Sequence, residues 1–286
     1  MAGTLFVVAT PIGNLEDITL RALRVLREAD LVVAEDTRSA GVLLSRHGVK
    51  RPLLSCHEHN EEARAEEVIA ALADGKRVAY VSEAGTPGVS DPGARLVARV
   101  SKAGHAVVPI PGPCAATAAL SASGLSADEF VFCGFLPPKA AARKKAIEAL
   151  ANEPRTLVFY EAPHRVQETL ADLAAVFGDR LSAVFRELTK LHEEAVRGTL
   201  SEVASRVASK EPRGEYVLVV SGCPPAAPAE VPAEELKSRV DRLCAEGLTK
   251  RDAVDHVAKE AHLPRKAVYS VINAPTHENT ASQDDI

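Results

Sequence analysis

The chain has 286 residues, of which 46% are apolar and 26% are charged, and its net charge is −5 at neutral pH. This length is typical of two domains, and this composition is typical of a soluble globular protein. The negative charge excludes a protein that attracts polyanions over its whole surface, so a contact with nucleic acid would need a local basic patch.

The cysteines and the apolar segments indicate the compartment. Five cysteines are scattered along the chain without a CxxC pair, which favours a reducing environment over a disulfide framework. The apolar run at residues 5–9 is too short for a signal peptide, and no stretch approaches the ~20 apolar residues of a membrane span. We therefore expect a cytoplasmic protein.

The first part of the chain, residues 1–124, alternates short apolar runs with segments of helical periodicity, which predicts an α/β domain. Thr19 is placed to cap the first helix, and Gly75 to end the third. The expected strands are residues 5–9, 31–34, 53–54, 77–81 and 106–109. The expected helices are residues 20–28, a segment ending near residue 47, and residues 61–73, 94–100 and 115–123.

The same alternation restarts after residues 124–127 and predicts a second α/β domain over residues 125–222. The expected strands are residues 130–132, 156–160, 181–185, 194–196 and 216–220. The expected helices are residues 140–151, 164–177 and 201–209. We therefore expect two α/β domains that face each other across a cleft.

The rest of the chain predicts a small helical domain. Residues 223–233 are rich in proline and alanine, which is typical of a semi-rigid linker. Residues 234–273 resemble a helix-turn-helix, with helices expected at 234–244, 250–260 and 264–272. The tail at 274–286 is polar and ends acidic, which favours disorder.

Three loops rich in glycine and proline follow strands of the first domain: residues 10–15 (TPIGNL), 82–93 (SEAGTPGVSDPG) and 111–113 (PGP). Ligands of open parallel sheets bind outside the carboxyl ends of the strands, where these loops lie. None matches a dinucleotide or P-loop motif, and none contains a lysine for a phosphate. A ligand with an amino acid group, a ribose and an adenine suits such loops better. The alternative is a set of stiff connections without a ligand.

Seven short motifs carry a family resemblance. They are residues 9–15 (ATPIGNL), 35–38 (EDTR), 82–93, 111–113, 134–137 (GFLP), 160–165 (YEAPHR) and 187–190 (ELTK). In this order they resemble the bacterial 16S ribosomal RNA (cytidine-2′-O)-methyltransferases of the tetrapyrrole methylase superfamily, over about residues 4–222. One position departs from the family pattern, because Glu83 stands where an aspartate is expected. The substitution keeps the charge and adds one methylene.

The resemblance implies a homodimer that binds S-adenosyl-L-methionine between its two α/β domains and methylates a cytidine 2′-OH in 16S rRNA of the small ribosomal subunit. By motif position, the implied cofactor residues are Pro11, Gly13, Glu83, Gly85, Thr86, Pro87, Ser90, Pro111, Gly112, Ala115, Leu136, Tyr160, Glu161, Gly214 and Glu215. Two other readings remain: a methyltransferase of the same superfamily that acts on a tetrapyrrole or a protein side chain, and a non-catalytic nucleic-acid-binding regulator that uses the C-terminal helices.

Methyl transfer to an oxygen needs little from the protein beyond alignment, since effective molarities can reach ~10⁵ M. A ribose hydroxyl is a weak acid, so a general base would help. The candidates are Asp36, Glu83, His164 and Lys190. Three of them have another reading: Glu83 could bind the cofactor's ammonium group or ribose, Asp36 could only pair with Arg38, and His164 could lie beside a helix N-cap.

The RNA candidates are Arg38, the basic run Lys139, Arg143, Lys144 and Lys145, and Arg165. They could follow phosphates, although a single basic run is often only a solvated helix face. His57 and His59 share one face of an extended segment, but no further Cys/His cluster completes a metal site, so we expect no metal.

Overall fold

The computed structural model describes residues 3–225, 231–261 and 263–273. The chain divides into two compact units, Met1–Cys223 and Pro224–Ile286, which are described separately. The tail at 274–286, expected to be disordered, and the middle of the expected linker lie outside the described residues.

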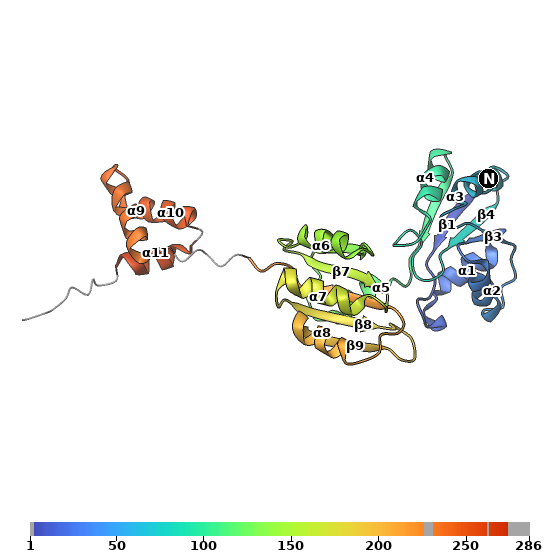
Figure 1. The fold of residues 1–286 in the computed structure, drawn as a ribbon. Helices are drawn as coiled ribbons and strands as arrows, with labels where there is room; N and C mark the ends of the chain where they lie inside the picture. Colours follow the sequence, from blue (N-terminus) through green and yellow to red (C-terminus); the bar gives the residue numbers. More distant parts are fainter. Residues whose placement is uncertain (1–2, 226–230, 262, 274–286) are drawn as a thin grey trace, which may run out of the picture. The chain divides into compact units, whose positions relative to one another are not determined.

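The first sheet is fully parallel and has the strand order β3-β2-β4-β1-β5 (Figure 1). Parallel strands place all their carboxyl ends on one edge, so the loops that follow them gather there. Its strands are β1 (Thr4–Val8), β2 (Leu31–Ala34), β3 (Leu53–Ser55), β4 (Arg77–Val81) and β5 (Ala106–Ile110).

Four helices cover the two faces of this sheet. Successive residues of a strand point to opposite faces, so neighbouring residues pack with different helices. Val32 packs with α1 (Leu20–Glu28) and α2 (Thr37–Arg46), whereas Val33 packs with α3 (Glu61–Ala73) and α4 (Ala94–Lys102). Thr19 caps α1, as expected, by accepting a hydrogen bond from Ala22 N at 3.0 Å. A short 3₁₀ helix, η1 (Leu15–Asp17), precedes α1 and was not expected.

The second sheet is mixed rather than parallel, with the order β6-β7-β10-β8-β9. Only β6 and β7 run parallel, and every other pair is antiparallel. The chain forms a β8–β9 hairpin without a helix between its strands, so alternation along the sequence alone did not reveal strand direction. The strands are β6 (Phe130–Phe135), β7 (Thr156–Glu161), β8 (Leu181–Arg186), β9 (Glu194–Thr199) and β10 (Tyr216–Val220).

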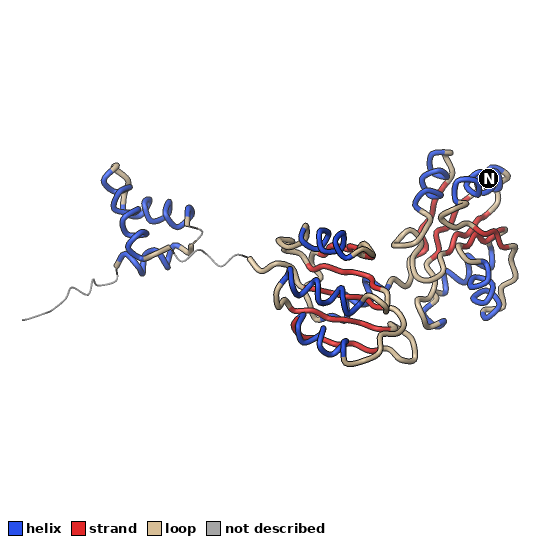
Figure 2. Tube along the Cα trace, viewed as in Figure 1, coloured by secondary structure: helices blue, strands red, loops and turns tan. Residues whose placement is uncertain are grey.

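The helices α6 (Ala140–Glu148), α7 (Val166–Phe177) and α8 (Leu200–Ala208) cover one face of this sheet (Figures 1 and 2). The other face is covered by α5 (Ala115–Ser123), which follows the last strand of the first sheet in sequence. Packing therefore passes from one sheet to the other before α5, whereas the expected domain boundary was residue 124.

The described residues of the C-terminal unit form three helices around a small core of their own. The helices are α9 (Ala233–Ala245), α10 (Lys250–Glu260) and α11 (Arg265–Ile272). Val240, Val257 and Val268 lie in that core and are at most 1% exposed. Among the described residues of both units, no helix is long and apolar enough to cross a membrane.

Candidate functional site

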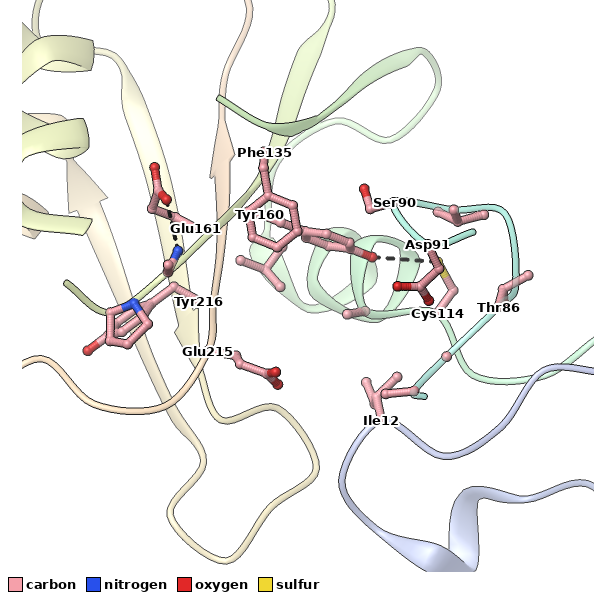
Figure 3. A pocket seen from close by; sticks show the side chains of 17 residues that line it. Ile12, Thr86, Ser90, Asp91, Cys114, Phe135, Tyr160, Glu161, Glu215 and Tyr216 are labelled. Atoms are coloured by element: carbon pink, nitrogen blue, oxygen red, sulfur yellow. Dashed lines mark hydrogen bonds between the residues drawn. The ribbon is translucent and has the colours of Figure 1, made fainter. Parts of the chain in front are cut away.

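A cavity of about 360 Å³ lies between the carboxyl edge of the first sheet and the second sheet, within the unit Met1–Cys223 (Figure 3). Its wall from the first half of the chain consists of Ile12, Ala84, Gly85, Thr86, Val89, Ser90, Asp91, Cys114 and Ala115. Its wall from the second half consists of Phe135, Tyr160, Glu161, Ala162, Pro163, Glu215, Tyr216 and Val217.

The three glycine- and proline-rich loops meet at this cavity and are bonded to one another. Thr10 N donates to Gly85 O at 2.8 Å, and Gly85 N donates to Thr10 O at 3.0 Å. Thr86 Oγ1 donates to Pro113 O at 3.0 Å. Gly85 has a φ of 80°, and a Cβ there would lie 3.3 Å from Ile12 Cγ2. Glycine at this position therefore permits both the turn and the close approach of the two loops.

The cavity contains a half-buried carboxyl group at Asp91, which was not among the expected site residues. Burial raises the pKa of Asp91 to about 6; a hydrogen bond from Ser82 opposes this rise, and the nearby carboxylates of Glu35, Glu83 and Glu215 add to it. The preceding residue, Ser90, has a φ of 61°, which costs energy for a residue other than glycine. The strained turn directs Asp91 toward Cys114 and the hydroxyl end of Tyr160 (Figure 3).

The second sheet supplies an aromatic wall. Tyr160 lies edge-to-face against Phe132 and Phe135, with ring centroids 4.9 and 5.6 Å apart. Its hydroxyl accepts a hydrogen bond from Ala116 N at 3.0 Å, which ties β7 to the first turn of α5. Phe135 is 54% exposed, although large aromatic side chains are usually buried. This wall offers apolar rings to a flat ligand.

Glu161 also borders the cavity, but its carboxylate is fully engaged inside the protein. Ala162 N donates to Oε1 at 2.8 Å, and Arg165 Nη2 lies 2.6 Å from the same oxygen. Thr169 Oγ1 donates to Oε2 at 2.6 Å. The side chain of Glu161 therefore fixes the start of α7 rather than offering a free acceptor to a ligand.

Seven of the fifteen expected cofactor residues line the cavity: Gly85, Thr86, Ser90, Ala115, Tyr160, Glu161 and Glu215. The others are near neighbours of lining residues in sequence: Pro11, Gly13, Glu83, Pro87, Pro111, Gly112, Leu136 and Gly214. Apolar lining residues such as Ile12 and Phe135 lie within the motifs but were not among the expected cofactor residues, whereas Cys114, Tyr216 and Val217 lie outside the motifs. For Asp91 a signal was present, because it is the second carboxylate of the 82–93 loop.

None of the four candidate bases is among the described residues that line the cavity. Asp36 caps α2 by accepting from Arg38 N at 2.7 Å, and the Arg38 guanidinium contacts both of its oxygens at 3.2 and 2.8 Å. These bonds from Arg38 lower the pKa of Asp36 to about 2, which makes it a weak base. Glu83 and His164 have exposed side chains beside the cavity-lining residues Ala84 and Pro163.

Lys190 is a cation in an ion-pair network at the rim. Its Nζ lies 2.9 Å from Glu187 Oε1 and 3.1 Å from Glu215 Oε2. Partial burial works to lower the pKa of Lys190, but the hydrogen bonds to the two glutamates outweigh it, so the pKa is raised. Beside it, Asn14 N donates to Thr189 Oγ1 at 3.1 Å, so the 187–190 loop contacts the 10–15 loop of the other half.

Among the expected RNA residues, Arg143 is buried and the expectation for it is wrong. Its side chain is 3% exposed, and its Nε and Nη2 lie 2.7 and 3.1 Å from Asp172 Oδ2 and Glu168 Oε2. Both acids belong to α7. The basic run contains no acid of its own, so its arginine pairs with carboxylates of a neighbouring helix. Arg165 is likewise 13% exposed and paired with Glu161.

The remaining expected RNA residues lie on the surface. Lys139, Lys144 and Lys145 are exposed, and so is Arg38 at 91%. The rings of His57 and His59 are 6.0 Å apart. Within the described ranges, no group of three or more His, Cys, Asp or Glu side chains is arranged to hold a metal ion.

Comparison with known proteins gives one family. The family "Tetrapyrrole (Corrin/Porphyrin) Methylases" matches residues 4–204. "Ribosomal RNA small subunit methyltransferase I" of Synechocystis is 45% identical over 94% of this chain and 97% of that protein. The proteins of the same name from Pseudomonas aeruginosa and Escherichia coli O157:H7 are 51% and 47% identical, over 86% and 82% of this chain and 88% and 83% of those proteins.

Solved structures agree with this family on the fold. The uroporphyrin-III-C-methyltransferase of Thermus thermophilus superposes with a TM-score of 0.55 at 25% identity, covering 77% of this chain and 94% of that one. The cobalt precorrin-4 methyltransferase CbiF superposes with a TM-score of 0.58 at 16% identity, covering 76% and 94%. The chain therefore belongs to the tetrapyrrole methylase family and, within it, to ribosomal RNA small subunit methyltransferase I, a group of enzymes that use S-adenosylmethionine.

Proposed function

We propose that this chain transfers the methyl group of S-adenosylmethionine to the ribose 2′-OH of a cytidine in the 16S rRNA of the small ribosomal subunit. The relatives named as small-subunit methyltransferases support the substrate. The observation that supports the position of the site is the cavity itself. There, three loops at the carboxyl edge of the parallel sheet face an aromatic wall, and a half-buried carboxyl group lies between them.

The residues of the cavity fit this cofactor. Small-molecule sites are mostly apolar and have volumes of roughly 300 to 1,000 Å³, and this one has about 360 Å³. The rings of Phe135 and Tyr160 suit an adenine, and the Asp91 carboxyl group suits a positively charged ligand. When bound, the cofactor supplies an electrophilic methyl group next to its sulfonium. The chain's part is to hold that ligand and keep water out.

The proposed reaction depends more on position than on a base. Asp36 has a pKa of about 2 and Lys190 is held as a cation, so neither is suited to accept a proton at neutral pH. Alignment of the acceptor hydroxyl could supply much of the rate without a base, since effective molarities can reach ~10⁵ M. Asp91, with a pKa of about 6, is the group within the cavity that is best suited to accept a proton.

The proposal includes a homodimer located in the cytoplasm, where bacterial ribosomal subunits are found. The exposed Lys139, Lys144, Lys145 and Arg38 are proposed to contact RNA phosphates. Arg143 and Arg165 are not part of this set, because both are held by carboxylates inside the protein.

The reaction is tested with small subunits that lack the modification. Purified protein, subunits and cofactor with a labelled methyl group are incubated, and the RNA is digested to nucleosides for mass spectrometry. We expect label in 2′-O-methylcytidine alone. Label on a base, on a ribosomal protein or on an added tetrapyrrole, with none on the ribose, would reject the proposed substrate.

The site is tested by calorimetric titration of a Gly85→Leu variant with S-adenosylmethionine. A side chain at φ 80° is strained, and its Cβ would meet Ile12, so we expect at least tenfold weaker binding. Gly104→Leu is a matched control, because Gly104 has a φ of 82° and nothing lies within 4 Å of a Cβ there. If both variants bind the cofactor like the parent, the site is elsewhere.

A further inference from the structure

We propose that the outer face of α2 is a docking groove for the sugar-phosphate backbone of the RNA substrate, an inference that rests on the proposed function. Two surface hollows meet there, since both are lined by Gly41 and Ser45. One hollow extends to Leu15 of η1, and the other to Leu53 of β3. Together they cross the surface of the first domain along one helix.

The charge of this groove favours a polyanion. Its lining contains four cationic side chains, Arg38, Arg46, Lys50 and Arg51, and no carboxylate. Arg38 pairs with Asp36, yet its side chain remains 91% exposed. Arg46 follows Arg38 by eight positions, so the two stand ~12 Å apart along the helix. Cations at intervals on one face form an electrostatic track for a nucleic-acid strand.

The opposite helical layer of the same sheet lacks this excess of charge. There, Arg99 of α4 is held by Glu62 and Glu66 of α3, and Arg64 pairs with Glu67. Most of the acidic side chains of α3 are therefore paired with its cations. The hollows of the α2 side, in contrast, are lined by cations without a carboxylate.

The shape of the groove permits a backbone to approach closely. Thr37, Gly41 and Ser45 are spaced four residues apart, so they form one stripe of small side chains along α2. A Cβ added to Gly41 would make an ordinary van der Waals contact with Leu53 Cδ1 at 3.7 Å, so the missing side chain leaves the floor of the groove low at this point. Val42 lies beside this stripe and is 68% exposed, so it offers an apolar contact to a sugar or base.

One end of the groove lies at the sheet edge that also borders the cofactor cavity. Its near end is formed by Leu15 and Thr37, which follow the 10–14 loop and strand β2 on the carboxyl edge of the first sheet. Ile12, three residues before Leu15, lines the cavity. A strand held along α2 would therefore approach the edge where the methyl group is offered.

The positive charge of the groove also favours RNA over a second copy of this chain as the occupant. In a twofold dimer the same patch of both subunits meets itself. That arrangement would bring the four cations of each groove against those of the other, and like charges destabilise such a contact.

The test is a double variant, Arg46→Gln with Lys50→Gln, in the full-length protein. Its matched control is Lys102→Gln with Arg206→Gln, which removes two exposed charges from α4 and α8. Binding of a single-stranded RNA oligonucleotide is measured by fluorescence anisotropy over a range of salt concentrations. Each phosphate contact contributes about 0.7 to the slope of log K against log salt, so we expect the slope to fall by about 1.4 in the test variant and not in the control.

Three further readouts separate the outcomes. The KM for small subunits should rise at least tenfold in the test variant, while cofactor affinity and oligomeric state stay unchanged. Equal slopes and equal KM values in both variants would overturn the groove. So would a change of oligomeric state, measured by sedimentation, with unchanged RNA binding, because it would show an interface between copies. If the parent protein itself transfers no methyl group to the subunits, the proposed function fails instead.

Discussion

At the scale of single residues, the surroundings of each carboxyl group near the site determine its pKa. Asp36 and Asp91 both follow strands of one sheet edge, yet Arg38 holds the pKa of Asp36 at about 2, whereas burial raises the pKa of Asp91 to about 6. Two aspartates on the same edge thus differ greatly in proton affinity. The difference arises first from the burial of Asp91 and from Arg38 beside Asp36, and carboxylates far from Asp91 in sequence, such as Glu35 and Glu215, add to it.

We predict that cofactor affinity rises between pH 5 and 7 as Asp91 becomes ionised, because a carboxylate attracts a cationic ligand and a neutral acid does not. Calorimetric titration across this range measures the effect. An Asp91→Asn variant should bind more weakly and lose the rise. A parent protein whose affinity is flat with pH would contradict the role given to Asp91.

Ionisation of Asp91 has the opposite effect on stability, because it lowers the free energy of unfolding. An acid whose pKa is raised on folding binds more protons in the folded than in the unfolded state, between its usual pKa near 4 and about 6. Without cofactor, the free energy of unfolding should therefore fall as the pH rises through this range and level off above it. The Asp91→Asn variant should lack this fall when urea unfolding is followed.

At the scale of elements, the positions of helices and strands were predicted from the sequence far better than which elements pack against each other. The cap at Thr19 and the apolar spacing of α1 are local, so the bounds of that helix were predictable. The packing of α5 on the second sheet depends on Val158, Phe185 and Val219, which arrive much later in the chain. The loops that form the cavity were predictable for a similar reason to α1, since glycine and proline act locally. Of the aromatic wall, Tyr160 was expected from its motif, whereas Phe135 was not.

Arg143 shows that the ion-pair partners of a charged side chain could not be predicted from the sequence either. This ion pair gives a further prediction. Replacing it by methionine would leave Asp172, whose side chain is 12% exposed, without its closest partner. Removing one member of a buried ion pair typically costs about 3 kcal/mol or more, although Lys144 at 3.6 Å offsets part of this loss. Urea unfolding measures the change, and Lys145→Met on the exposed side of α6 should shift stability by less than about 0.5 kcal/mol.

The double variant Arg143→Met with Asp172→Leu serves as the second arm, because it removes both charges. It should recover most of the lost stability. If Arg143→Met alone leaves stability unchanged but weakens RNA binding, Arg143 contacts RNA after all.

At the scale of the whole molecule, the chain consists of a unit that holds the cavity and a small helical unit with a separate core. We predict that a chain ending at Cys223 folds and binds S-adenosylmethionine within about twofold of the full-length affinity, because every residue lining the cavity precedes that point. Ending at Cys223 keeps its hydrogen bond to Glu153 O at 2.6 Å. Loss of cofactor binding in a folded truncated chain would show that the helical unit supports the site.

The position of β10 bears on when the protein becomes active during its own synthesis. This strand is the last of its sheet to be translated, yet it lies in the centre, between β7 and β8. It also carries Tyr216 and Val217 of the cavity wall. Until residue 220 has left the ribosome, β7 and β8 have no partner between them and the cavity lacks one side. A growing chain therefore cannot assemble the site before that point, so the cavity forms only after more than two thirds of the 286 residues have been made.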